Sequence, residues 1–216
     1  MRGLTAVANL ILLSCAWLVF SIPVITIGPA TAALYYTTQK MVRGENPSIF
    51  RCFWKGFRDN LKQGIVLTLI FGAAAALMYY DYLFSYMVGD SLGTTLRIAF
   101  VIMAIVWLMV VCYAFPLLAQ FQNSTKTTLK NALLLSLVHL GKTVLLVVLH
   151  LIPVAVCLAL PELFARLLPL WLFGAPGIIA YLSTLWMKKV WAALMEKARS
   201  DGASAEEPQA SDDPES

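Results

Sequence analysis

The chain has 216 residues, of which 60% are hydrophobic and 13% charged, and its formal net charge is +4. A soluble domain is about half apolar and about a quarter charged, and a chain of this length could not bury so much apolar surface in one core. The composition therefore excludes an ordinary soluble domain and predicts an all-α, polytopic membrane helical bundle. The four cysteines are widely spaced without a CxxC pair, which favours structural roles, and neither a metal nor a cofactor is predicted.

The N-terminal stretch from Gly3 to Gln39 contains no charged side chain. It is too long for one membrane span and too short for two at about 20 residues each. Pro23 and the Gly28-Pro29 pair interrupt it, since proline removes a backbone donor and disfavours helix before it. We therefore predict a first span over residues 4–22 and a short helix over residues 29–42, together a broken N-terminal helix.

Two processing signals are alternatives for this stretch. Ala30-Thr31-Ala32 resembles the small-residue site that follows a secretory signal, and residues 12–15 resemble a lipoprotein cleavage box. The apolar sequence continues past both positions, so we favour uncleaved helices.

Residues 47–63 form a segment of different character, because aromatic and basic residues alternate in it. Phe50, Trp54, Phe57 and Leu61 recur at spacings of four, three and four, so they are expected on one helical face. The candidate interfacial residues of this segment are Arg51, Trp54, Lys55, Arg58 and Lys62. An amphipathic helix with a basic face lies at the membrane surface near anionic lipids. Docking of a cytosolic partner protein is the other interpretation.

Four further apolar runs follow, over residues 64–82, 98–118, 143–161 and 167–187. Together with the first span they make five, or six if residues 29–42 also cross. Residues 1–199 are thus predicted to form one transmembrane domain. The last 16 residues carry six acids, and residues 200–216 predict a disordered acidic tail.

The charges of the connections alternate along the chain. Residues 40–62 contain six Lys or Arg residues, and residues 120–142 contain three with no acid. The connection over residues 81–97 has two acids and one base. Because basic loops mark the cytoplasmic side, we predict a multi-pass protein with a cytoplasmic C-terminus. The N-terminus is outside with five spans and inside with six.

Several N-terminal residues are shared with a known family: Asn9, Trp17, the run Ser21–Tyr35 and Arg43-Gly44-Glu45. With these residues the chain resembles the YesL family, small bacterial membrane proteins grouped as a domain of unknown function. The resemblance covers roughly residues 5–190. It implies a bacterial plasma membrane protein encoded in a carbohydrate-uptake context, with carbohydrate ABC-transporter components as partners, and it supplies no catalytic residue.

Motifs that would carry catalysis are missing from the sequence. There is no GxxxxGK[ST] loop, HExxH or GxSxG motif, and no acid lies in the middle of a predicted span, so we expect no enzyme and no proton carrier with an intramembrane carboxylate. The bilayer is the one partner that the composition itself predicts. Neither a nucleic-acid partner nor an oligomeric state is indicated.

Proline and glycine breaks are the most distinctive feature inside the spans. Such breaks line ligand cavities in transporters, but small residues also allow close helix packing. His150, near Pro153, either relays protons or is a neutral histidine bonded to a carbonyl that the proline frees. The candidate cavity or helix-break residues are Pro23, Thr26, Gly28, Pro29, Thr31, Tyr35, His150, Gly174, Pro176 and Gly177.

Two functions are compatible with these features. The first is an accessory or regulatory membrane protein of carbohydrate uptake, working through its basic cytoplasmic face. The alternative is a small transporter or permease-like subunit with a cavity at the helix breaks; a membrane-embedded enzyme comes third. A polar cavity within the bundle would favour transport, whereas close packing with an exposed basic helix would favour the accessory role.

Overall fold

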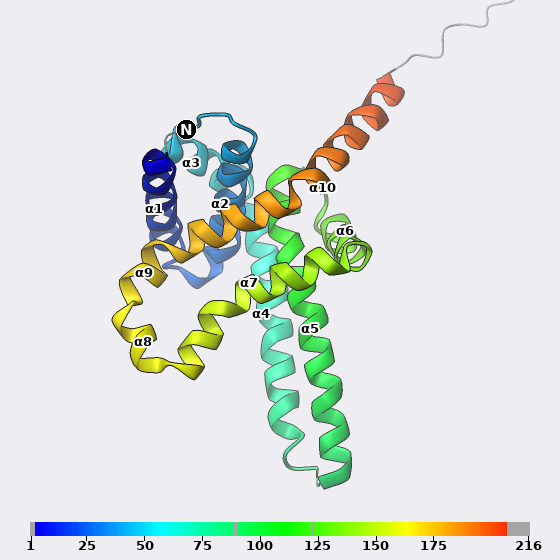
Figure 1. The fold of residues 1–216 in the computed structure, drawn as a ribbon. Helices are drawn as coiled ribbons and strands as arrows, with labels where there is room; N and C mark the ends of the chain where they lie inside the picture. Colours follow the sequence, from blue (N-terminus) through cyan, green and yellow to red (C-terminus); the bar gives the residue numbers. More distant parts are fainter. Residues whose placement is uncertain (1–2, 89, 122, 207–216) are drawn as a thin grey trace, which may run out of the picture.

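The computed structural model describes residues 3–88, 90–121 and 123–206, and every regular element in these ranges is a helix (Figure 1). A helical bundle is therefore confirmed. The elements are α1 (Gly3–Phe20), η1 (Val24–Thr26), α2 (Ile27–Val42), α3 (Ile49–Asp59), α4 (Leu61–Phe84), α5 (Asp90–Gln120), α6 (Thr125–Val138), α7 (Leu140–Ala159), α8 (Pro161–Arg166), α9 (Leu168–Phe173) and α10 (Ala175–Glu206).

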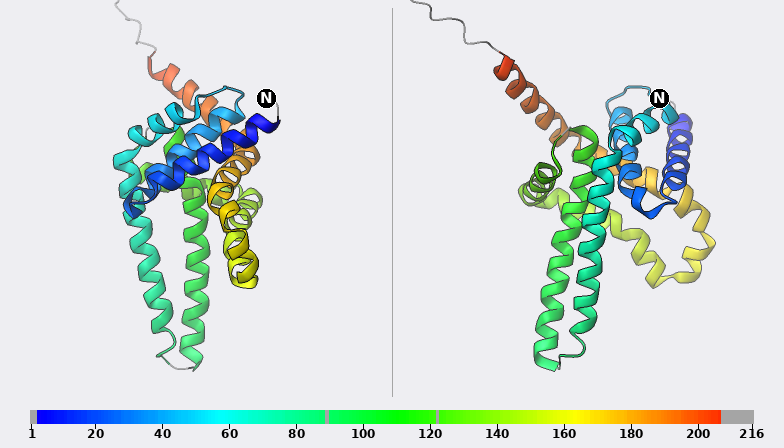
Figure 2. Two further views of the ribbon diagram at one scale, coloured as in Figure 1. Left: turned by 90° about the vertical axis from the view of Figure 1, so that its left-hand side faces the viewer. Right: turned by 180° about the vertical axis from the view of Figure 1, so that it is seen from behind.

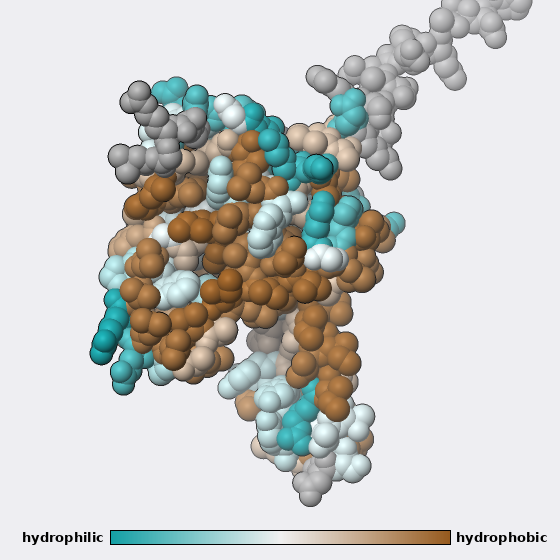
Figure 3. All heavy atoms as spheres, in the orientation of Figure 1, coloured by the Kyte–Doolittle hydropathy of each residue, from teal (hydrophilic) through white to brown (hydrophobic). Residues whose placement is uncertain are grey.

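Three described helices are long and apolar enough to cross a bilayer, namely Leu61–Phe84, Ser91–Gln120 and Leu140–Ala159. They contain most of the predicted spans 64–82, 98–118 and 143–161. Figure 3 shows the apolar surface as a broad brown zone, with hydrophilic groups gathered at its upper edge, at its lower left and toward the tip of the α4–α5 hairpin. The chain is a membrane protein by these criteria, and the total number of spans stays a prediction.

The predicted span over residues 167–187 is not one helix. Helix α9 ends at Phe173 and α10 begins at Ala175, so the chain breaks at Gly174. Helix α10 then continues to Glu206, into the segment predicted to be a disordered tail. The rest of that tail, residues 207–216, lies outside the described residues.

Helices α1 and α2 form an antiparallel hairpin. The last residue of α1, Phe20, packs against the aromatic rings of α3, whereas the start of α1 lies toward the end of the molecule that carries the α2–α3 connection (Figures 1 and 2). This order is that of the six-span alternative, in which both ends of the pair face one side. The turn between the two helices lies well short of the tip of the α4–α5 hairpin (Figure 1).

The turn of this hairpin is apolar and satisfies its own backbone. Ile22 and Val24 are 75% and 71% exposed. The hydroxyl of Thr26 lies 2.7 Å from the carbonyl oxygens of both Phe20 and Pro23, to which it can donate. A turn without charges and with its freed carbonyls paired is suited to an apolar environment, where unsatisfied backbone groups are costly.

Helix α2 lies at the centre of the bundle and contacts α1, α3, α4, α5 and α10. Its fully buried Ala30, Ala32 and Ala33 allow these neighbours to approach closely. The Gln39 side chain, also buried, donates from Nε2 to the carbonyl oxygen of Pro116 at 3.1 Å. The short apolar helix is therefore a packing hub.

Helix α3 covers most of the predicted amphipathic segment over residues 47–63. It ends at Asp59, and its buried side is Cys52, Phe53, Gly56 and Phe57. Phe50 and Trp54, which were predicted to share a helical face with Phe57, are 66% and 46% exposed, and Trp54 stacks on Phe57. At Gly56 a Cβ would lie 3.0 Å from the Tyr36 side chain, so this bare position faces α2.

Candidate functional site

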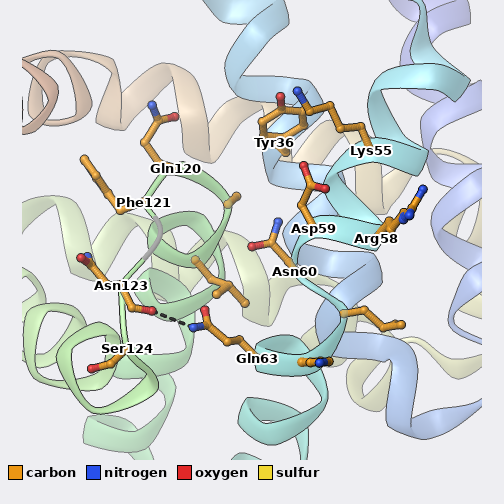
Figure 4. A pocket seen from close by; sticks show the side chains of 14 residues that line it. Tyr36, Lys55, Arg58, Asp59, Asn60, Gln63, Gln120, Phe121, Asn123 and Ser124 are labelled. Atoms are coloured by element: carbon orange, nitrogen blue, oxygen red, sulfur yellow. Dashed lines mark hydrogen bonds between the residues drawn. The ribbon is translucent and has the colours of Figure 1, made fainter.

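A polar cleft opens between the α3–α4 junction and the α5–α6 connection (Figure 4). Its volume is about 780 Å³. Most of its lining is polar or charged, and the residues are Tyr36, Lys55, Arg58, Asp59, Asn60, Leu61, Lys62, Gln63, Leu118, Ala119, Gln120, Phe121, Asn123 and Ser124. A cleft of this size and polarity at the end of an apolar bundle is the strongest candidate for a binding site.

A hydrogen bond connects the two walls of the polar cleft. The Gln63 side chain donates from Nε2 to the carbonyl oxygen of Asn123 at 2.9 Å, as drawn in Figure 4. Asn60 donates from Nδ2 to the carbonyl oxygen of Gly56 at 2.8 Å, which ties the side chain to the last turn of α3. The amide oxygens of Asn60 and Gln63 therefore remain available as acceptors.

The charge of the lining is unbalanced. Three cationic side chains, Lys55, Arg58 and Lys62, oppose the single carboxylate of Asp59, a difference of +2. None of these four side chains forms an ion pair with another residue in the described part of the chain. In Figure 4 the Lys55 side chain extends toward Tyr36, whereas Arg58 points away from the α5–α6 wall.

Two helices begin at the polar cleft. Helix α4 starts at Leu61, and α6 starts at Thr125 directly after Ser124. The Ser124 hydroxyl accepts a hydrogen bond from the backbone N–H of Thr127 at 3.3 Å. The first turn of a helix has unpaired N–H groups and the positive end of the helix dipole. Because α3 ends at Asp59 and α5 ends at Gln120 in the same cleft, the negative ends of these two helices offset that effect.

The predicted interfacial residues are all exposed, but they are divided between two locations. Lys55, Arg58 and Lys62 line the polar cleft, whereas Arg51 and Trp54 do not. The amide-bearing residues of the cleft were not predicted as site residues. A polar residue at or directly before a helix N-cap, as at Asn60 and Asn123, is the sequence signal that could have indicated them.

At the first helix break, Gly28 and Pro29 pack against α4. The backbone N–H of Gly28 donates to the Thr68 hydroxyl at 3.0 Å. A Cβ at Gly28 would collide with the Thr68 hydroxyl and the Gly64 carbonyl oxygen, and one at Gly64 would lie 2.6 Å from the Pro29 nitrogen. The glycines are therefore required by a close crossing of α2 and α4.

At the second break, Gly174 and Gly177 contact α1. Ser14 Oγ accepts from the Gly177 N–H at 2.9 Å and lies 3.4 Å from the Gly174 carbonyl oxygen. Pro176 is half-buried in the first turn of α10. None of these residues lines the polar cleft, and the cavity predicted at the breaks stays a prediction.

Tyr35 and His150 form a polar pair between α2 and α7, with Tyr35 Oη 3.2 Å from His150 Nε2. His150 Nδ1 lies 2.8 Å from the carbonyl oxygen of Leu146, which can only accept, so Nδ1 carries the proton and Nε2 accepts from Tyr35. This geometry fits the structural interpretation of a neutral histidine. The acceptor is Leu146, however, and not the carbonyl four residues before Pro153.

Thr31, another predicted cavity residue, accepts a hydrogen bond from Trp17 Nε1 at 3.1 Å.

Comparison with known proteins finds a match to one protein-family model. Residues 10–82 match the model of a family described as "Protein of unknown function, DUF624". This match supports the predicted resemblance to a family of bacterial membrane proteins of unknown function. This DUF624 segment comprises most of α1, all of η1, α2 and α3, and α4 as far as Tyr82, so it supplies one complete wall of the polar cleft.

The chain is also similar to the uncharacterized protein YteU of Bacillus subtilis (strain 168). The two are 28% identical over 190 residues, which cover 86% of this chain and 81% of that protein. No solved structure matches this chain.

Among the described residues, no group of three His, Cys, Asp or Glu side chains could hold a metal ion.

Proposed function

We propose that this chain is an accessory protein of bacterial carbohydrate uptake, without catalytic activity of its own, that works through the cytoplasmic face of the plasma membrane. The polar cleft carries this proposal. It gathers three unpaired cations at one end of the bundle, whereas the helix-break residues described above pack against neighbouring helices.

The orientation is part of the proposal. Lys and Arg concentrate in the α2–α4 and α5–α7 connections, which favours the cytoplasm for the end that carries the polar cleft. Since α1 begins at that same end, we place both termini inside. The test uses a cysteine-free chain with a single cysteine at Glu45 or at Met87. A membrane-impermeant maleimide should label M87C in intact cells and E45C after permeabilisation, and the reverse pattern would refute the orientation.

The carbohydrate context rests on the resemblance to the YesL family, which implies ABC-transporter components as partners. Exposed cations beside an amphipathic helix with exposed Phe50 and Trp54 support docking at the membrane surface. Docking through the polar cleft would require no catalytic group in this chain.

Affinity purification of the tagged chain from native membranes tests this function. We expect a carbohydrate-uptake component to co-purify with the wild type. Recovery should fall when Lys55, Arg58 and Lys62 are all changed to Gln. The matched control changes three exposed lysines on the same predicted side, and these are Lys130, Lys188 and Lys189. Equal recovery with both triple variants, or no uptake component with the wild type, would contradict the proposal.

A small transporter is the alternative function, and the Tyr35–His150 pair is the observation that favours it. This pair places two polar side chains between α2 and α7, inside the bundle. A transporter that uses the pair should lose substrate uptake in reconstituted vesicles when His150 is changed to Ala. The cleft variants should leave that uptake intact.

A further inference from the structure

We propose that the polar cleft binds a phosphate ester of a small hydroxylated alcohol, either as a soluble molecule or as the headgroup of an anionic lipid. The proposal concerns what occupies the cleft. It rests on the proposed function only in placing the cleft at the cytoplasmic side, where both forms of this ligand occur.

The negative charge of the ligand follows from the lining. Lys55, Arg58 and Lys62 outnumber Asp59 and have no ion-pair partner among the described residues. The starts of α4 and α6 lie at the cleft together with the ends of α3 and α5, so the helix dipoles largely offset one another and the excess positive charge comes from the side chains. Phosphate oxygens bind well at such sites, because charge-assisted hydrogen bonds combine with backbone N–H groups.

The hydroxylated part of the ligand follows from the volume and from the acceptors. About 780 Å³ is the size of a small-molecule site, much larger than one phosphate group requires. The amide oxygens of Asn60 and Gln63 can accept hydrogen bonds, because the bonds that these side chains form come from their amide nitrogens. Asp59 is an additional acceptor. A carboxylate would repel a bare phosphate, but it can accept a hydrogen bond from an alcohol hydroxyl.

The position of the cleft makes it accessible both to a lipid headgroup and to a soluble phosphate ester. Helix α3 exposes Phe50 and Trp54 beside the cleft, as expected for a helix at the bilayer surface. A lipid headgroup could therefore enter from the membrane side, and a soluble ester could enter from the cytosol.

Thermal unfolding of the purified full-length chain tests the proposal. One arm adds glycerol 3-phosphate in detergent at constant ionic strength, and the other compares phosphatidylcholine nanodiscs with and without phosphatidylglycerol. A ligand that binds the native state raises Tm. A rise with glycerol 3-phosphate identifies a soluble ester, and a rise with phosphatidylglycerol alone identifies a lipid headgroup. If neither raises Tm, the proposal is wrong.

Variants decide whether the cleft itself is responsible. Changing Lys55, Arg58 and Lys62 to Gln should weaken binding at least about tenfold, since charge-assisted hydrogen bonds are lost. The matched triple change at Lys130, Lys188 and Lys189 should leave binding unchanged. Equal losses in the two triple variants would show attraction to general surface charge and would overturn the proposal.

Asp59 provides a test in which the affinity for phosphate is expected to rise and not to fall. Asp59→Asn removes a negative charge, so affinity for inorganic phosphate should rise. At the same time, the preference for glycerol 3-phosphate over inorganic phosphate should fall, because an acceptor of the alcohol hydroxyls is weakened. An unchanged preference would contradict the role assigned to Asp59. If the wild type binds neither ester form but still recovers an uptake component, this inference alone is refuted; if it binds an ester but recovers no uptake component, the accessory function alone is refuted.

Discussion

The crossing of α2 and α4 at Gly64 gives the sharpest stability prediction. A Cβ at Gly64 would lie 2.6 Å from the Pro29 nitrogen and 2.8 Å from its Cα and Cδ. These atoms belong to a backbone and a ring, so the helices must move apart. Overpacking of this kind costs about 1–3 kcal/mol, and a contact with backbone falls at the upper end. The change to alanine also recovers about 1 kcal/mol of helix propensity, so Gly64→Ala should destabilise by a net ~2 kcal/mol.

Gly72 on the same helix is a matched control, because nothing lies within 4 Å of a Cβ built there. The propensity gain is common to both variants, so the difference between them isolates the clash, about 3 kcal/mol. At about 2–4 °C per kcal/mol for a chain of this length, Gly64→Ala should unfold ~6–12 °C below Gly72→Ala. The assay is thermal unfolding of the detergent-solubilised variants, followed by tryptophan fluorescence. Equal unfolding temperatures would refute the close crossing.

Three smaller effects can be measured in the same assay. Ser14→Ala leaves a buried backbone N–H of α10 unpaired and should cost about 1–3 kcal/mol, whereas Ser14→Thr, which keeps the hydroxyl, should cost less unless the extra methyl clashes. Tyr35→Phe removes the donor to His150 and should cost about 1 kcal/mol; no change in Tm would show that the pair is not formed. The Arg43 hydrogen bond holds the pKa of Glu45 below its usual value, so this half-exposed carboxylate contributes below ~1 kcal/mol at neutral pH. That contribution is complete above the unfolded pKa of about 4.3 and is lost as pH falls through the lower folded pKa. Glu45→Gln should therefore lower Tm at pH 7 and have no effect in strong acid, and an effect independent of pH would contradict this.

Much of the fold follows from one-dimensional patterns. Charge-free runs indicated the regions of α4, α5 and α7, because a bilayer requires long apolar helices. The Pro23 break was also predictable, since proline cannot continue the hydrogen-bond pattern of α1. The sequence left the path of residues 29–42 open between five and six spans. The antiparallel course of α1 and α2 depends on contacts between distant helices, which periodicity does not contain.

The polar cleft was only partly predictable, for a similar reason. Lys55, Arg58 and Lys62 stood out as a basic face within one segment. The buried side of α3 could not be predicted in the same way. It includes Gly56, whose missing side chain allows α3 and α2 to approach closely. The meeting of Gln63 with Asn123 joins residues 60 positions apart, and no local pattern indicates it.

The match over residues 10–82 divides the molecule in a way that bears on function. This segment contains the packing hub α2 and the α3–α4 wall of the polar cleft, whereas the α5–α6 connection supplies the opposite wall. A ligand between the walls would contact the matched segment on one side and the rest of the chain on the other. The hydrogen bond from Gln63 to the carbonyl oxygen of Asn123 already joins the two segments across this boundary.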